Sequence, residues 1–313
     1  MISIKQLRYL DAIARFGHFG KAAEHCAVTQ PALSMQIQEM ERDLGVQLVE
    51  RRPKGASLTE TGREIARRGG RILREVRDIT DYARQSDQPL AAPIKLGVIP
   101  TVAPYVLPPL LPILRQQYPQ LDLYVRETHT QQLIAELIDG TLDLLLLALP
   151  VEHPDIETIQ LLEDRFLLAL PADRQVHGHI RATPELVKND RVLLLEEGHC
   201  LRDQALAFCR LRKLDSIDTF GASSLSTIVQ MVANGMGLTF LPEISIGFET
   251  MHSKIRIMRF KEPEPKRTLG LAWRTSSPRR RDFAEFGKLI VECIGHSRDQ
   301  SRNRKFLPLT GSG

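Results

Sequence analysis

Apolar residues recur along the first sixty positions at the three- and four-residue spacing of short amphipathic helices. Residues 4–15 place Leu7, Leu10 and Ile13 on one side of a helix. Residues 20–26 predict a second short helix, in which neighbouring alanines allow close packing against another helix. The chain is therefore expected to begin with a compact group of short helices.

A third helix is predicted between Thr29, a suitable N-cap, and Gly45, a residue type that commonly ends helices. Pro31 falls in its first turn, where the missing N–H of proline costs nothing. One face of this helix is apolar, and the opposite face carries short or polar side chains. Residues 46–58 then predict a hairpin with cations at its tip.

Short helices joined by a tight turn and followed by a basic hairpin describe a winged helix-turn-helix over residues 1–58. Such a unit inserts a helix into the major groove of DNA and places its wing against phosphates. The candidate DNA contacts are Gln30, Pro31, Ser34, Met35, Gln38, Arg51, Arg52 and Lys54. The alternative is a helical subdomain whose polar faces are simply solvated. Short exposed side chains and clustered cations favour DNA.

Residues 59–90 predict a linker helix followed by a hinge. Its apolar or small residues recur at alternating spacings of four and three, which is a heptad seam. The seam consists of Ile65, Gly69, Ile72, Val76, Ile79 and Ala83. We expect a homodimer, because a two-fold protein matches a pseudo-palindromic DNA site. The alternative is an amphipathic helix packed on its own chain.

From residue 94 onward, predicted strands and helices alternate, which is typical of an α/β domain with its ligand site at strand carboxyl ends. Strands are expected at 94–99, 121–127, 142–149, 166–169, 192–195, 238–241 and 269–273. Helices are expected at 104–118, 131–138, 224–234 and 281–294, and from 201 onward. We expect a regulatory domain over 91–300, with one lobe at about 93–164 plus 268–300 and the other at 165–267. Residues 301–313 are expected to form a flexible C-terminal tail.

Composition adds limits on the class of protein. A chain of 313 residues suits two or three domains. The first residues lack the basic and apolar segments of a signal peptide, and the apolar run 142–149 is too short to span a membrane. Four cysteines without regular spacing argue against a disulfide scaffold and a zinc site. We expect a cytoplasmic chain with no cofactor, metal or membrane partner. The net charge of +4 is too small to indicate nucleic acid by itself.

Cys200 and Cys209 form the most informative pair in the sequence. Nine residues of predicted helix put their Cα atoms about 13.5 Å apart, whereas a disulfide needs about 4.4–6.8 Å. The two can bond only if the helix unwinds. Cys200 lies near the helix N-terminus beside His199 and Arg202, where the dipole and nearby cations favour a thiolate. The pair is a candidate redox switch; the alternative is two small buried apolar residues.

The assembled order of elements resembles the LysR-type transcriptional regulators over nearly the whole chain. The matching segments are residues 29–34, 44–51, 58–62 and 234–242. Residues 99–105, 196–204 and 263–271 are similar to the members of that family that sense hydrogen peroxide. The resemblance implies a periplasmic-binding-protein-like regulatory domain and a homodimer or homotetramer. It also implies binding to double-stranded promoter DNA, contact with RNA polymerase and no enzymatic turnover.

The resemblance also implies roles for single residues. Cys200 would be the peroxidatic cysteine, and Cys209 would resolve its sulfenic acid as a disulfide. The residues around the peroxide would be Thr101, Thr130, His199 and Arg267. This set is chemically reasonable, because a thiolate that displaces hydroxide from peroxide needs donors on the leaving oxygen. Oxidation could also stop at the sulfenic acid if the second cysteine stays buried.

Simpler roles remain open for these supporting residues. Thr101 and Thr130 each follow a predicted strand and suit helix capping, which is compatible with a role at the site. Arg267 could form a surface ion pair with Glu262 or Glu264.

Two other functions compete with peroxide sensing. One is a LysR-type regulator that binds a small carboxylate between its lobes; the cysteine pair argues against it, because such a regulator needs no pair. The other is a thiol peroxidase, but catalysis has no use for a DNA-binding unit and a heptad linker.

Overall fold

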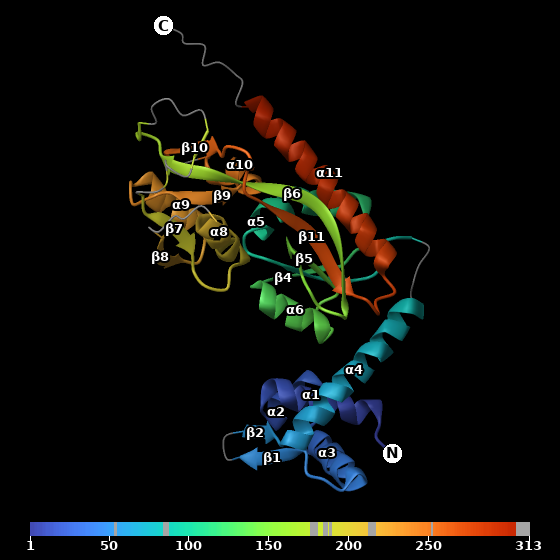
Figure 1. Ribbon diagram of the computed structural model, residues 1–313. Coiled ribbons are helices and arrows are strands. Elements are labelled where there is room, and N and C mark those ends of the chain that lie inside the picture. The colour runs from blue at the N-terminus through green and yellow to red at the C-terminus, as the bar shows by residue number, and fades with distance from the viewer. Residues whose placement is uncertain are drawn as a thin grey trace. The chain divides into compact units, whose positions relative to one another are not determined.

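The computed structural model describes residues 1–52, 55–83, 88–175, 181–183, 187, 190–211, 217–251 and 253–304 (Figure 1). The chain divides into two compact units, Met1–Gln85 and Ser86–Gly313. Within the described residues, no helix is both long and apolar enough to cross a membrane.

The first unit is a winged helix-turn-helix with a long helix attached. Its elements are α1 (Ile4–Phe16), α2 (Phe19–His25), α3 (Gln30–Leu44), β1 (Val49–Arg52), β2 (Gly55–Leu58) and α4 (Glu60–Ala83). Both predicted ends of α3 are confirmed: the Thr29 hydroxyl accepts from the Ala32 N–H at 3.4 Å, and Gly45 has a left-handed φ of 69°. The Glu41 carboxylate accepts from the N–H groups of Leu48 and Val49, which ties the wing to α3.

Helix α4 starts on the winged unit and then leaves it. A Cβ at Gly69 would lie 3.0 Å from the Leu7 side chain, so glycine allows the close approach of α1 and α4. Ile65 also packs against the core of this unit. This first part of the heptad seam therefore contacts its own chain, as the alternative expected. Further along, Ile72 and Ile79 are 46% and 67% exposed.

The second unit is built on a curved, seven-stranded mixed sheet with a smaller two-stranded sheet beside it. The strands are β3 (Ile94–Val98), β4 (Leu123–Glu127), β5 (Leu144–Leu149), β6 (Ile156–Pro171), β7 (Val192–Leu195), β8 (Ile217–Ala222), β9 (Thr239–Pro242), β10 (Ile255–Arg259) and β11 (Lys266–Arg274). The helices are α5 (Ala103–Gln117), α6 (Thr130–Ile138), α8 (Cys200–Leu211), α9 (Leu225–Ala233), α10 (Ile246–Glu249) and α11 (Arg280–Arg304).

Strand β6 runs through both lobes (Figure 1). Its first part pairs with β11 as far as Arg165, and its second part pairs with β9 and β10 from Phe166 onward. Each part borders a separate hydrophobic core, one centred on β3 and β5 and the other on β7 and α9. The expected two-lobed α/β regulatory fold is thereby confirmed.

Several expected boundaries were wrong. Only residues 166–169 of β6 were predicted. The earlier part of the strand was missed because it is half-exposed and is held extended by its pairing with the distant β11. Strands β8 and β10 were not predicted; β10 is a short edge strand that carries two arginines among its five residues. Residues 301–304 are helical rather than part of a tail, since α11 continues to Arg304. The remainder of the expected tail, 305–313, lies outside the described residues.

Candidate functional site

Two of the expected site residues follow the carboxyl ends of neighbouring strands. Strands β3 and β4 are parallel, and Val98 pairs with Glu127 at their ends. Thr101 and Thr130 each come three residues beyond these paired positions, and Thr130 is the first residue of α6. The edge formed by parallel strand carboxyl ends is where α/β sheets commonly bind ligands.

Arg267 connects this edge to the crossing between the lobes. Its Nη1 donates to the Thr101 hydroxyl at 2.9 Å and its Nη2 to the Thr101 carbonyl at 3.1 Å. Its Nε donates at 2.9 Å to Asp164, which also accepts from the Ile244 N–H. The side chains of Arg267 and Asp164 are both fully buried. The alternative of a surface ion pair with Glu262 or Glu264 is therefore wrong.

Neither threonine caps a helix with its side chain. The N-cap of α5 is Val102 and that of α6 is His129, and neither cap involves a side-chain hydrogen bond. Because the Thr101 oxygen accepts from Arg267, its own hydrogen is available for donation. The hydroxyl oxygen of Thr130 is buried and has no hydrogen-bond partner among the described residues. Helix capping thus explains neither residue.

The turn before α8 brings His199 and Cys200 towards the same place. His199 is buried, and its ring meets that of His129 at a centroid distance of 4.5 Å and an angle of 79°. Burial lowers the pKa of His199, and the nearby His129 lowers it further, which disfavours the cation that the sequence analysis expected beside Cys200. Cys200 is half-buried and packs against the core of the first lobe, although the helix that it begins belongs to the second.

Three polar atoms in this region lack partners within the described part of the chain. They are the Thr130 hydroxyl oxygen and the Nδ1 atoms of His129 and His199. Buried polar atoms are nearly always hydrogen-bonded, so this group fits a small polar molecule. The described residues contain no group of three histidine, cysteine or carboxylate side chains that could hold a metal ion.

Helix α8 contains both cysteines of the expected pair. Its span from Cys200 to Leu211 is continuous, so the two Cα atoms are about 13.5 Å apart along the axis. The side chain of Cys209 lies outside the described part. Burial is the largest cause that raises the thiol pKa of Cys26 and of Cys293. These two cysteines are therefore poor nucleophiles, and Cys200 has the better access.

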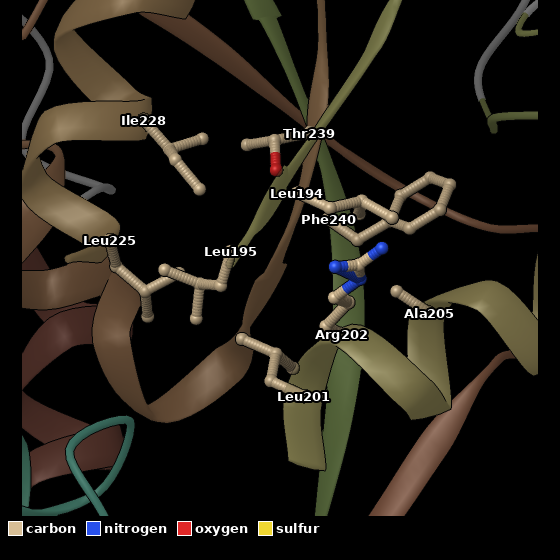
Figure 2. Close-up of a pocket in the computed structure, with 9 residues that line it drawn as sticks. All are labelled: Leu194, Leu195, Leu201, Arg202, Ala205, Leu225, Ile228, Thr239 and Phe240. Atoms are coloured by element: carbon tan, nitrogen blue, oxygen red, sulfur yellow. The ribbon is translucent and has the colours of Figure 1, made fainter. Parts of the chain in front are cut away.

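A small cavity lies between β7, α8, α9 and β9, inside the second lobe. Figure 2 shows Arg202 pointing from α8 towards apolar side chains such as Leu194 of β7 and Phe240 of β9. The cavity has room for about one water molecule. It is too small for a carboxylate metabolite.

The predicted DNA-binding face of α3 is available on the first unit. Gln30, Pro31, Met35 and Gln38 are exposed, and Ser34 is half-buried. They lie opposite the buried stripe of Leu33, Ile37 and Met40. Arg51 and Arg52 lie on β1, but their side chains, and all of Lys54, fall outside the described residues.

Sequence reasoning did not find His129 and Asp164 as residues of this site. His129 sits between two threonines at a strand end, so its polarity alone is not informative. Asp164 was assigned to a lobe boundary, and its contact with Arg267 joins positions 103 residues apart. One available signal was a carboxylate at the start of an otherwise apolar strand.

A winged helix-turn-helix followed by a two-lobed α/β unit defines a DNA-binding transcription regulator. Residues 4–63 match the bacterial regulatory helix-turn-helix family of the LysR type, and residues 87–293 match the LysR substrate binding domain. The chain belongs to the LysR family of transcription regulators.

Within that family, the chain is similar to OxyR proteins. It is 37% identical to the DNA-binding transcriptional dual regulator OxyR of Escherichia coli K12, over 94% of this chain and 97% of the relative. A cysteine-to-aspartate variant of full-length OxyR from Pseudomonas aeruginosa matches with a TM-score of 0.77 and 35% identity, over 94% of this chain and 99% of that one. A cysteine-to-serine variant of Corynebacterium glutamicum OxyR with hydrogen peroxide bound matches with a TM-score of 0.67 and 31% identity, covering 97% and 98%.

Proposed function

We propose that this chain is a transcription regulator that senses hydrogen peroxide through Cys200 and controls antioxidant genes. The observation that carries the proposal is the group of unpartnered buried polar atoms beside the start of α8, where the half-buried Cys200 lies. A peroxide molecule is small and can both donate and accept hydrogen bonds. The similarity to OxyR proteins, one of them with hydrogen peroxide bound, supports the same ligand.

The proposed reaction is a two-electron oxidation of sulfur. The Cys200 thiolate attacks one peroxide oxygen, so that an S–O bond forms while the O–O bond breaks. The leaving oxygen takes a proton and departs as water, and Cys200 becomes a sulfenic acid. Thr101, Thr130, His199 and Arg267 are the proposed sources of hydrogen bonds to the peroxide. Donors placed where negative charge develops lower the barrier.

The second proposed step is capture by Cys209. Its thiolate attacks the sulfur of the sulfenic acid, an S–S bond forms, and the departing hydroxide is protonated to water. Because α8 holds the two cysteines too far apart for a disulfide, the helix has to unwind first. The covalent bond then stabilises a second packing of this segment, and that packing changes the arrangement of the subunits.

The proposed output is a change in DNA contacts. A homodimer joined through the exposed part of α4 would read a pseudo-palindromic promoter site, and two dimers would form a homotetramer. As an activator, the protein would contact RNA polymerase at that promoter. The proposed place of action is the cytoplasm, where the DNA is.

Thiol mapping after a brief stoichiometric peroxide pulse tests this function. We expect mass spectrometry of the full chain to find a Cys200–Cys209 disulfide, with Cys26 and Cys293 unmodified because they are buried. Cys200→Ser should abolish the transcriptional response, and Cys209→Ser should accumulate the sulfenic acid. Finding both thiols free while transcription is activated would remove the cysteine pair from the mechanism.

A further inference from the structure

His129 occupies an N-cap position without acting as a cap. In α1, α3 and α9, by contrast, the N-cap side chain accepts a hydrogen bond from the first turn of its helix. The His129 ring instead lies against the turn that precedes Cys200. It meets His199 in an edge-to-face contact at 4.5 Å. A Cβ at Gly198 would be 3.4 Å from its Nδ1, an ordinary contact distance, so the imidazole lies directly beside this turn.

This contact joins the two lobes at the proposed peroxide site. His129 precedes α6 in the first lobe, whereas His199 precedes α8, whose buried residue Leu201 belongs to the core of the second. Both imidazoles carry a buried Nδ1 with no partner within the described residues. No hydrogen bond of the described residues fixes the Nδ1 of His199, so the orientation of its ring depends on packing, to which the His129 ring contributes.

We propose that His129 is a positioning residue for the oxidation of Cys200: it holds the His199 ring in place and keeps that ring neutral. The inference rests on the proposed function. A neutral imidazole has one nitrogen that accepts and one that donates. It can take the proton of the Cys200 thiol and deliver it to the hydroxide that leaves peroxide. A ring that is already protonated cannot take that proton.

The electrostatic surroundings support a neutral His199. Burial lowers its pKa most, and the like charge of a protonated His129 lowers it further, whereas Glu196 acts in the opposite direction. Besides Cys200 itself, the other ionisable groups of the turn and the first turn of α8 are Glu197, Arg202 and Asp203. Glu197 is 92% exposed and lies 3.8 Å from Arg202. Asp203 is also exposed, so these two carboxylates act on His199 mainly through solvent, whereas the Arg202 side chain is only 12% exposed and points into the cavity of the second lobe.

The sign of the expected effect follows from these charges. His129→Gln removes the like charge and should raise the pKa of His199, so the acid limb of the oxidation profile should move to higher pH. His129→Lys supplies a permanent cation and should move that limb to lower pH. A purely structural role would shift both variants in the same direction or in neither. His153→Gln, at another histidine of the regulatory unit, is the matched control and should leave the profile unchanged.

The experiment uses the full-length protein. Rapid-quench thiol trapping at a series of pH values between about 5 and 8, the range in which histidine titrates, gives the rate of Cys200 oxidation by hydrogen peroxide. NMR titration of His199 in the unaltered protein gives a second measurement, expected below the ordinary value of 6.5. Urea denaturation of each variant checks that its regulatory unit is folded.

The possible outcomes separate the two proposals. Opposite shifts in the Gln and Lys variants support the role of His129. Equal or absent shifts, or a His199 that titrates at or above its ordinary value, overturn that role while peroxide sensing stands. If hydrogen peroxide leaves Cys200 of the unaltered protein unoxidised at every pH, the proposed function itself is wrong.

Discussion

Arg267 makes two different interactions, so a single substitution of it would change both the stability of the regulatory unit and the proposed chemistry. It compensates the buried charge of Asp164, and it donates to the Thr101 hydroxyl. Removing one partner of a buried ion pair typically costs about 3–5 kcal/mol, because the other charge stays buried and unpaired. Arg267→Ala should therefore destabilise the regulatory unit by about that amount in urea denaturation. Its effect on oxidation would be mixed with this loss of stability.

Thr101→Val tests the chemistry with a smaller expected loss of stability, because Arg267 loses one acceptor but keeps Asp164 and the Thr101 carbonyl. The substitution keeps the shape of the side chain and removes the hydroxyl that we propose donates to the peroxide. We expect the rate of Cys200 oxidation to fall by about 100-fold, the loss typical of removing one donor aimed at developing negative charge. Stopped-flow measurement of thiol oxidation gives this rate. Thr128→Val, at a half-buried threonine whose hydroxyl bonds Gln132, is the control and should oxidise at the normal rate.

At the scale of elements, α4 has two parts with different partners. Its start packs on α1 through Gly69, whereas Val76 and Ile79 are 39% and 67% exposed. An exposed apolar stripe that continues a heptad pattern is a surface for a second helix. The dimer contact is therefore expected along the later turns of α4.

Charging those later turns should separate the subunits. Val76→Glu with Ile79→Glu places like charges where two helices would meet, and the dissociation constant of the dimer should rise at least about 10-fold, equal to 1.4 kcal/mol. Light scattering across a dilution series measures it. Arg71→Glu changes the net charge by the same two units at an exposed position off the seam, and should leave the dimer intact. A folded double variant of unchanged mass would place the dimer contact elsewhere.

The sequence predicted elements whose ends are set by local chemistry and failed where a distant partner decides. Thr29 and Gly45 fix the ends of α3 through a cap and a left-handed residue, and both act within their own turn. Strand β6 depends on β11, about a hundred residues away in the chain, so its half-exposed first part carries no local signal. Thr101 and Arg267 were expected only through resemblance to a family. His129 was missed because its partner is a ring that folding brings close.

At the scale of the whole chain, the segment that follows the hinge is anchored on the regulatory unit by hydrogen bonds. Leu90 is buried with a left-handed φ of 59°, and its N–H donates to Asp282 at 3.2 Å. Arg279 donates to the Ala92 carbonyl and pairs with the same Asp282. The chain at residues 90–92 is thus tied to the start of α11.

DNA recognition should divide between α3 and the wing. Ser34→Arg and Gln30→Ala alter the face expected in the major groove, so discrimination between sequences should fall by about 1–3 kcal/mol. Arg51→Ala should weaken binding to all sequences and reduce the slope of log affinity against log salt by about one. Fluorescence anisotropy at several salt concentrations measures both effects. Lys95→Ala, at an exposed cation of the regulatory unit, is the control and should bind DNA normally. Unchanged affinity and discrimination in the Ser34, Gln30 and Arg51 variants would contradict the assignment.

Strand β6 has a mechanical consequence for the whole regulatory unit. It changes pairing partners between Arg165 and Phe166, next to the buried Asp164 that holds Arg267 and, through it, Thr101. The proposed chemistry would therefore take place beside the point where β6 crosses from one lobe to the other. In a rotation of one lobe on the other about this crossing, residues near the crossing would move least and residues far from it would move most. A remodelling of a few residues here would leave the crossing strand nearly in place, while the outer surfaces of the lobes would move farthest.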